Sequence, residues 1–229
     1  MERFINILNP VRITGSDNMT KETLQSGTTT LGMVCKEGVV LAADRRATLG
    51  GRIVAHKKTQ KIAKLNNEMA VTWAGSVSDI QLLTKIIKAQ IRLIELRRNK
   101  KLKVKEVANM TGSLLYSHIR QFFPGIVAFL LGGKDEEGTY LYELGPDGSI
   151  LMHDDYVTDG SGMMYAMGVL EANYKKDISI NEGVKLAVKS ISASIQRDTA
   201  SGNGIDVYTI TKDGVKKVLA KEVNMSISM

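Results

Sequence analysis

Strands and helices alternate along this chain in an order that few folds accommodate. Strand patterns follow position 27 and give way to two amphipathic helical patterns, three further strands, two further helices and a closing pair of strands. Helices that occur in pairs between runs of antiparallel strands favour an α+β fold. We therefore expect a core of two sheets with helices packed outside it.

Hydrophobic periodicity and turn residues locate the individual elements. Val39–Ala43 is an unbroken apolar run, as expected of a strand covered on both faces. A capping box, Ser179–Glu182, starts the last helix. The two helical stripes comprise Ile80, Leu83, Ile87, Ile91 and Ile94, and then Val107, Met110, Leu114, Ile119 and Phe122. Strands are expected at 28–36, 39–44, 68–74, 125–131, 139–144, 149–152, 205–211 and 215–219, with a further helix over 162–174.

The first 27 residues differ in character from the rest. Positions 13–27 are polar and lack sustained periodicity, which predicts a flexible extension, and the composition changes sharply at Thr28. The whole chain has 229 residues, and 43% of them are hydrophobic, enough for one domain with a substantial core. We expect one domain over 28–229, preceded by the extension.

Cysteine usage and hydropathy exclude several classes of protein. Cys35 is the single cysteine of the sequence, so an internal disulfide and a multi-cysteine zinc site are both excluded, and its apolar surroundings predict a buried small side chain. No stretch approaches the roughly 20 apolar residues that span a bilayer, and the N-terminus lacks a secretory apolar region. We expect a cytoplasmic protein with no membrane partner and no metal or cofactor.

The net charge of +7 raises the question of nucleic-acid binding. Six basic residues fall within positions 97–105, but no aromatic residue for base stacking lies among them. The cluster lies between two helical patterns, where a solvated loop is expected. We therefore expect no nucleic-acid partner and rank a basic binding module last among the alternatives.

Several short motifs occur in a fixed order along the chain. Three threonines at a strand start, as in Gln25–Gly32, are ordinary when taken alone, because threonine favours strands. The other motifs are Asp44–Thr48, Lys61–Ile62, Thr72–Asp79, Thr158–Gly162 and Gln196–Gly202. Together, in this order, they resemble the archaeal-type proteasome β subunits, which are threonine proteases among the N-terminal nucleophile hydrolases. The resemblance runs from Thr28 almost to the C-terminus.

The resemblance implies a fold and a maturation step. The fold would be a four-layer αββα sandwich, with 1–27 a propeptide and 28–229 the catalytic domain. Cleavage between Gly27 and Thr28 would free the α-amino group of Thr28, whose reference pKa of about 7.7–8.0 makes it a base for the threonine's own hydroxyl. While Gly27 is attached, that nitrogen is an amide and accepts no proton. Gly27 has no side chain to block the approach of the hydroxyl.

The resemblance also implies roles for other residues. Lys61 would aid proton transfer through its positive charge, Asp44 would hold that lysine, and Arg46 would be a structural partner of the same cluster. Gly75 would donate its backbone N–H to the developing oxyanion. The residues expected to surround and orient the terminal amine are Ser161, Asp198 and Ser201.

The substrate pocket implied by the resemblance contains one unusual residue. Its expected lining consists of Ala47, Thr48, Trp73, Gly75 and Val77. Trp73 is bulkier than the usual occupant, although Ala47 and Ala63 leave room, so a preference for small or medium side chains is predicted. The alternative is that Trp73 packs in the core. One extra residue between Arg46 and Lys61 is expected to be absorbed by a turn at Gly50–Gly51.

The resemblance implies partners that the residues themselves do not reveal. These are other β subunits in a seven-membered ring, proteasome α-subunit rings, an ATP-dependent unfoldase and unfolded protein substrates. Two further readings remain open: a non-catalytic structural β subunit of the same assembly, and a simpler bacterial two-component N-terminal nucleophile enzyme. The long extension fits the bacterial type less well.

Overall fold

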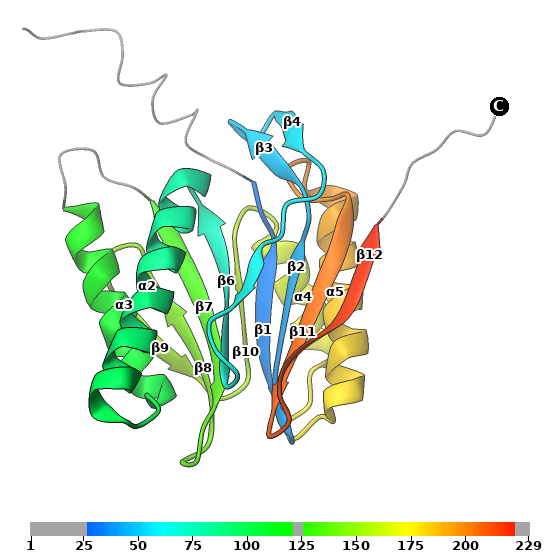
Figure 1. Ribbon diagram of the computed structural model, residues 1–229. Helices are drawn as coiled ribbons and strands as arrows, with labels where there is room; N and C mark the ends of the chain where they lie inside the picture. Colours follow the sequence, from blue (N-terminus) through cyan, green and yellow to red (C-terminus); the bar gives the residue numbers. More distant parts are fainter. Residues whose placement is uncertain (1–26, 121–125, 223–229) are drawn as a thin grey trace, which may run out of the picture.

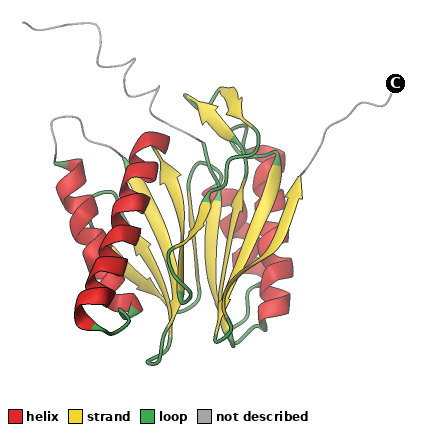
Figure 2. Ribbon diagram, viewed as in Figure 1, coloured by secondary structure: helices red, strands yellow, loops and turns green. Residues whose placement is uncertain are grey.

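The computed structural model describes residues 27–120 and 126–222. They form four layers, in which two five-stranded antiparallel sheets face each other between two pairs of helices (Figures 1 and 2). The first sheet has the order β10-β1-β2-β11-β12, comprising Tyr156–Asp159, Thr30–Cys35, Gly38–Asp44, Gly204–Thr211 and Gly214–Glu222. The second has the order β5-β6-β7-β8-β9, comprising Ile62–Lys64, Met69–Gly75, Val127–Lys134, Thr139–Leu144 and Ile150–His153. The expected αββα sandwich is confirmed.

The helices cover the outer faces of the two sheets. In Figure 1, α2 and α3 lie outside the β5–β9 sheet, and α4 and α5 lie outside the other. A short hairpin, β3 and β4, extends beyond the sheets at one end of the molecule (Figure 1). The bounds are Val77–Arg98 for α2, Val104–Ile119 for α3, Met163–Asn173 for α4, Ile180–Arg197 for α5, Ala47–Leu49 for β3 and Ile53–His56 for β4.

Three hydrophobic clusters fill the three interfaces between the four layers. The first, around Phe129, joins α2 and α3 to their sheet. The second, around Leu41 and Leu130, lies between the two sheets. The third, around Leu31 and Ile191, joins α4 and α5 to the other sheet. All seven residues of β2 are buried, as expected of a strand covered on both faces.

The helix predictions hold in their local detail. Four residues of the first predicted stripe, including Ile80 and Ile91, are buried in α2. The Ser179 hydroxyl accepts the Glu182 N–H at 3.3 Å, and the Glu182 carboxylate accepts the Ser179 N–H at 3.2 Å, which confirms the capping box. Cys35 is buried, and burial raises the pKa of its thiol to about 12. None of the described helices is long and apolar enough to cross a bilayer.

Some predictions needed correction or cannot be followed. The strands β3, β4, β5 and β10 are not among those expected above, because each has only three or four residues and no distinct periodicity. Residues 1–26 of the expected extension, Phe122 and position 125 lie outside the described residues. The basic cluster is largely exposed, as expected, and three of its side chains form ion pairs, namely Arg98 with Glu106, Lys101 with Glu68 and Lys103 with Glu137.

Candidate active site

The predicted site residues come together at one end of the sandwich, beside the β3–β4 hairpin (Figure 1). Antiparallel pairing explains this arrangement, because a strand that starts at this end lies next to one that finishes there. Thr28 precedes β1, and Asp44 ends β2 beside it. Five further site residues flank elements that begin or finish at the same end: Lys61, Gly75, Ser161, Asp198 and Ser201.

Asp44 is a fully buried carboxylate with four hydrogen-bond donors. Its Oδ1 accepts the Lys61 ammonium at 2.7 Å and the Thr29 N–H at 2.9 Å. Its Oδ2 accepts the backbone N–H groups of Arg46 and Gly202, each at 2.9 Å. A buried charge is tolerated when its lone pairs are satisfied in this way. Asp44 therefore connects the start of β1, its own turn, the lysine and the loop after α5.

Lys61 is almost fully buried, with 2% of its surface exposed. Its Nζ donates to Asp44 Oδ1 and, at 3.1 Å, to the carbonyl oxygen of Gly27. Burial lowers the pKa of the lysine below its usual 10.5, and the negative charge of Asp44 opposes this shift only in part. The expected pairing of Asp44 with Lys61 is present, and the lysine also reaches the predicted cleavage site.

The Gly27–Thr28 peptide is held from several sides. The Thr28 hydroxyl donates to the Gly27 carbonyl oxygen at 2.7 Å, so two donors share that oxygen. The Gly27 N–H donates to Thr48 Oγ1 at 2.8 Å. A Cβ at position 27 would lie 1.8 Å from the Cβ of Ala200, which explains why this position must be glycine. The carbonyl of Gly27 is thus fixed against both Thr28 and Lys61.

A second group of hydroxyls and a carboxylate lies on the other side of Thr28. The Thr28 N–H donates to Ser161 Oγ at 3.1 Å. The Ser161 and Ser201 hydroxyls both donate to Asp198 Oδ2, each at 2.6 Å. The three residues predicted to surround the nitrogen of Thr28 therefore form one connected group, and Ser161 is its link to that nitrogen.

Arg46 holds the loop that carries this group. Its Nε donates to Asn203 Oδ1 at 2.8 Å, and its Nη1 donates to the Thr199 carbonyl oxygen at 2.7 Å. The guanidinium passes so close to Gly202 that a Cβ there would lie 2.4 Å from it. These contacts place Arg46 as a structural partner of the cluster, as predicted.

The predicted pocket residues lie at the same end of the molecule, and one of them, Thr48, accepts the Gly27 N–H. Ala47 and Thr48 belong to β3, and Val77 is the exposed first residue of α2. Trp73 is partly buried and packs, like Ala63, against the core beneath α2 and α3. The turn after β3 contains Gly50 and Gly51, both with positive φ, as a tight turn requires.

Gly75 has a backbone conformation that suits glycine alone. It ends β6 opposite Val127, with φ of 129°. A Cβ would lie 2.1 Å from the Ile126 carbonyl oxygen. The structure thus explains the glycine by packing, and its role as an oxyanion donor stays a prediction.

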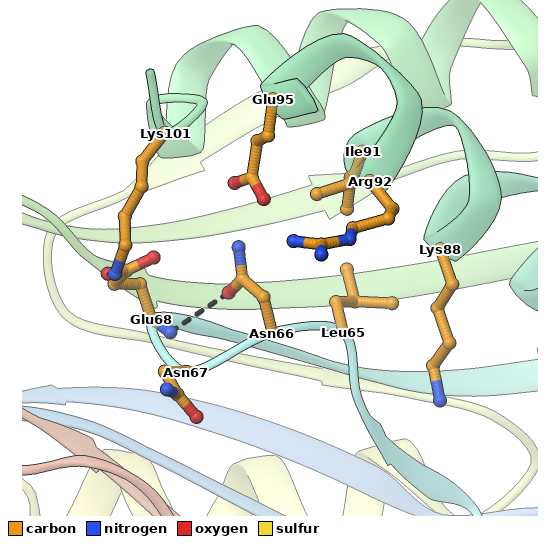
Figure 3. Close-up of a pocket in the computed structure, with 9 residues that line it drawn as sticks. All are labelled: Leu65, Asn66, Asn67, Glu68, Lys88, Ile91, Arg92, Glu95 and Lys101. Atoms are coloured by element: carbon orange, nitrogen blue, oxygen red, sulfur yellow. Dashed lines mark hydrogen bonds and ion pairs between the residues drawn. The ribbon is translucent and has the colours of Figure 1, made fainter. Parts of the chain in front are cut away.

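A separate cavity of about 300 Å³ lies at the opposite end, between α2 and the β5–β6 turn (Figure 3). The Asn66 Oδ1 there accepts the Glu68 N–H at 2.9 Å. The lining side chains include no serine, threonine, cysteine or histidine, so the cavity offers no hydroxyl, thiol or imidazole group. They are Leu65, Asn66, Asn67, Glu68, Lys88, Ile91, Arg92, Glu95 and Lys101. Across the described part of the chain, no cluster of acidic, histidine or cysteine side chains could hold a metal ion.

The arrangement around Thr28 combines a hydroxyl, a peptide carbonyl held by a buried lysine, and a polar group at the threonine nitrogen. A family model described as "Proteasome subunit" matches residues 24–210, which include every one of these groups. This chain belongs to the proteasome family. Proteasome subunit beta of Archaeoglobus fulgidus is 42% identical over 211 residues, covering 92% of this chain and 98% of the relative.

Other proteasome relatives show comparable similarity. The chain is 45% identical to proteasome subunit beta of Methanobrevibacter smithii over 198 residues, covering 86% of this chain and 94% of the relative. It is 43% identical to that of Haloquadratum walsbyi over 192 residues, covering 84% and 76%. The resemblance inferred from the ordered motifs is therefore confirmed at the level of family and fold.

Sequence reasoning missed the roles of two residues within the site. Thr29 donates its N–H to Asp44 and its hydroxyl contacts Ser201, and Gly202 donates its N–H to Asp44. Thr29 was visible as the second member of the threonine run, but a β-branched residue at a strand start carries no signal of its own. Gly202 could not be paired with Asp44 from sequence, because 158 positions separate them.

Proposed function

We propose that this chain is the catalytic β subunit of a proteasome core, a threonine endopeptidase that hydrolyses peptide bonds of unfolded proteins. The observation that carries the proposal is the shared carbonyl oxygen of Gly27, which accepts both the Thr28 hydroxyl at 2.7 Å and the Lys61 ammonium at 3.1 Å. Two donors on one carbonyl polarise it toward nucleophilic attack. The nucleophile, the electrophile and a cation are thus adjacent at the predicted cleavage site.

The first reaction would be self-cleavage after Gly27. Thr28 Oγ1 attacks the carbonyl carbon of Gly27, the C–N bond breaks, and the proton lost by the hydroxyl passes to the departing nitrogen, which becomes the free amine of Thr28. Gly27 is then joined to the Thr28 oxygen as an ester. A water molecule hydrolyses the ester, which leaves a carboxylate on Gly27 and restores the threonine hydroxyl. In this proposal residues 1–27 are the propeptide and 28–229 the mature subunit.

The mature enzyme would repeat this chemistry on substrates. The Thr28 amine takes the proton of the hydroxyl, the oxygen attacks the substrate carbonyl, and the leaving amine receives a proton. Water then hydrolyses the acyl ester. The cationic Lys61 stabilises the negative charge that develops nearby, and burial lowers its pKa below the usual 10.5. Ser161, Asp198 and Ser201 hold the amine, and Gly75 donates to the oxyanion.

We also propose the cellular setting that goes with this activity. The subunit would join other β subunits in a seven-membered ring between α-subunit rings, in the cytoplasm, and an ATP-dependent unfoldase would deliver unfolded proteins. The proposal rests on the family and on the named relatives, each of which is a proteasome subunit beta.

The test is co-expression with a proteasome α subunit, followed by mass measurement of this chain. The wild type is expected to lose 27 residues, while Thr28→Ala retains them. Thr30→Val serves as the matched control, because it removes a neighbouring buried hydroxyl whose one bond, to the Asp159 carbonyl oxygen, is long at 3.5 Å. Retention of Met1 in assembled wild-type subunits would favour the non-catalytic alternative instead.

A further inference from the structure

Thr29 occupies the point where the two halves of the site meet. It is fully buried, and its backbone N–H donates to Asp44 Oδ1 at 2.9 Å, while its carbonyl oxygen accepts the Asp44 N–H at 3.1 Å. Its side chain turns the other way, with Oγ1 lying 2.7 Å from Ser201 Oγ. Thr29 therefore contacts the lysine-bearing half through its backbone and the amine-bearing half through its hydroxyl.

The direction of the hydrogen bond between Thr29 and Ser201 follows from the neighbouring bonds. Ser201 has one hydroxyl proton and donates it to Asp198 Oδ2 at 2.6 Å. Its oxygen can then only accept from Thr29, so Thr29 is the donor. The result is a series of hydrogen bonds in which Thr29 donates to Ser201, Ser201 donates to Asp198, and Ser161 donates to the same carboxylate oxygen.

This series of hydrogen bonds ends at the nitrogen of Thr28. Ser161 accepts the Thr28 N–H at 3.1 Å, and its hydroxyl has two acceptors, Asp198 Oδ2 at 2.6 Å and, at a longer 3.2 Å, the Thr28 carbonyl oxygen. If the Ser201 hydroxyl turned away, Asp198 Oδ2 would lose one of its two hydroxyl donors. The carboxylate would then be less well satisfied and would attract a nearby ammonium group more strongly.

We propose that the Thr29 hydroxyl is a positioning group, which fixes Ser201 against Asp198 and thereby sets the protonation of the Thr28 amine. The proposal rests on the proposed function, in which that amine is the base. Thr29 touches no reacting atom and acts only through Ser201 and Asp198. Its hydroxyl would thus control the acid side of the pH–activity profile.

The competing explanation is that Thr29 merely fills space at the start of β1. The chain offers a matched comparison in Thr30, which is also fully buried and also a threonine of the same segment. The Thr30 hydroxyl makes only the long 3.5 Å contact to the carbonyl oxygen of Asp159. A packing role would make valine equally tolerable at both positions, whereas a donor role distinguishes them.

The experiment compares Thr29→Val, Thr29→Ser and Thr30→Val in subunits co-assembled with α subunits. For Thr29→Val we expect kcat about tenfold lower with KM unchanged, as for the loss of one buried hydrogen bond. The acid limb of its kcat/KM profile should move about half a unit toward higher pH, because an ammonium is favoured beside a less satisfied carboxylate. Thr29→Ser should restore both properties, and Thr30→Val should resemble the wild type.

A crystal structure of Thr29→Val separates this inference from the proposed function. We expect Ser201 Oγ to leave Asp198 Oδ2 in that variant and to stay there in Thr30→Val. Movement of Ser201 together with an inactive wild type would overturn the proposed function and keep the positioning role. Three results would overturn the positioning role. They are an active wild type with Ser201 unmoved in Thr29→Val, equal losses of activity in Thr29→Val and Thr30→Val, and no recovery of activity in Thr29→Ser. Thr29→Ala provides the same comparison if Thr29→Val does not fold.

Discussion

Gly27→Ala is the change whose effect on self-cleavage follows most directly from the geometry. A Cβ at this position would lie 1.8 Å from the Cβ, 2.8 Å from the Cα and 3.0 Å from the carbonyl oxygen of Ala200. Non-bonded carbon atoms approach to about 3.5–4.0 Å at best. Because Ala200 is itself buried, the Gly27–Thr28 peptide must move by about 1.5 Å or more to make room.

That displacement would move the carbonyl relative to the lysine that holds it. Gly27 O now lies 3.1 Å from Lys61 Nζ, and a shift of this size away from the lysine would take that bond out of hydrogen-bonding range. A misplacement of about 1 Å between reacting groups costs about 100-fold in rate. We therefore expect self-cleavage of Gly27→Ala to be at least about 100-fold slower than that of the wild type.

The assay follows the loss of the extension by mass, over time, after assembly with α subunits. Gly138→Ala in the β7–β8 turn is the matched control, because its added Cβ meets atoms no closer than 3.6 Å and should leave processing unchanged. Ala200→Gly combined with Gly27→Ala removes the closest clash and should recover part of the rate. Cleavage of Gly27→Ala at the wild-type rate, or no recovery in the double variant, would refute the steric argument.

Three further outcomes are expected. Lys61→Met should abolish self-cleavage. The variant should also lose a pH dependence of stability. Because burial lowers the pKa of Lys61 in the folded protein below 10.5, the unfolded chain binds one more proton than the folded protein between the folded pKa and 10.5, so the unfolding free energy of the wild type should rise with pH in that window. Unfolding free energies measured at several pH values should not show this rise in Lys61→Met. Asp44→Asn should lower the unfolding free energy by about 3–5 kcal/mol, since it breaks a buried ion pair and sets an amide against two donors; a urea titration showing under 1 kcal/mol would contradict this. Trp73→Ala should shift cleavage of a fluorogenic peptide panel toward large aromatic and leucine side chains. If the wild type already cleaves those substrates best and the variant does not differ from it, Trp73 does not limit the pocket.

The long elements could be predicted from the sequence because their signals are local. The apolar run Val39–Ala43 lies within β2, the stripe from Ile80 to Ile91 faces the core from α2, and the box Ser179–Glu182 caps α5. Each signal depends on residues within a few turns or strand positions of one another. The short strands β3, β4 and β10 gave no such signal, since their pairing partners decide them.

The sequence named candidate site residues but revealed only some of the contacts between them. The ordered motifs named Thr28, Asp44, Lys61, Ser161 and Asp198, and the structure brings all five within one hydrogen-bonded region. The motifs did not reveal that Lys61 also binds the Gly27 carbonyl. That contact depends on where two segments, separated by 34 positions, meet in space.

The sequence by itself determined the family, the succession of strands and helices, and the residue types available for chemistry, because these follow from local pattern and from the order of motifs. Tertiary structure alone decided which atoms face one another. It directs two donors onto the Gly27 carbonyl, leaves no room for a side chain there beside Ala200, and makes Thr29 the bridge between Asp44 and Ser201. Hydrogen bonds and close contacts depend on distances of tenths of an ångström between distant segments, and only the packing of the two sheets sets those distances.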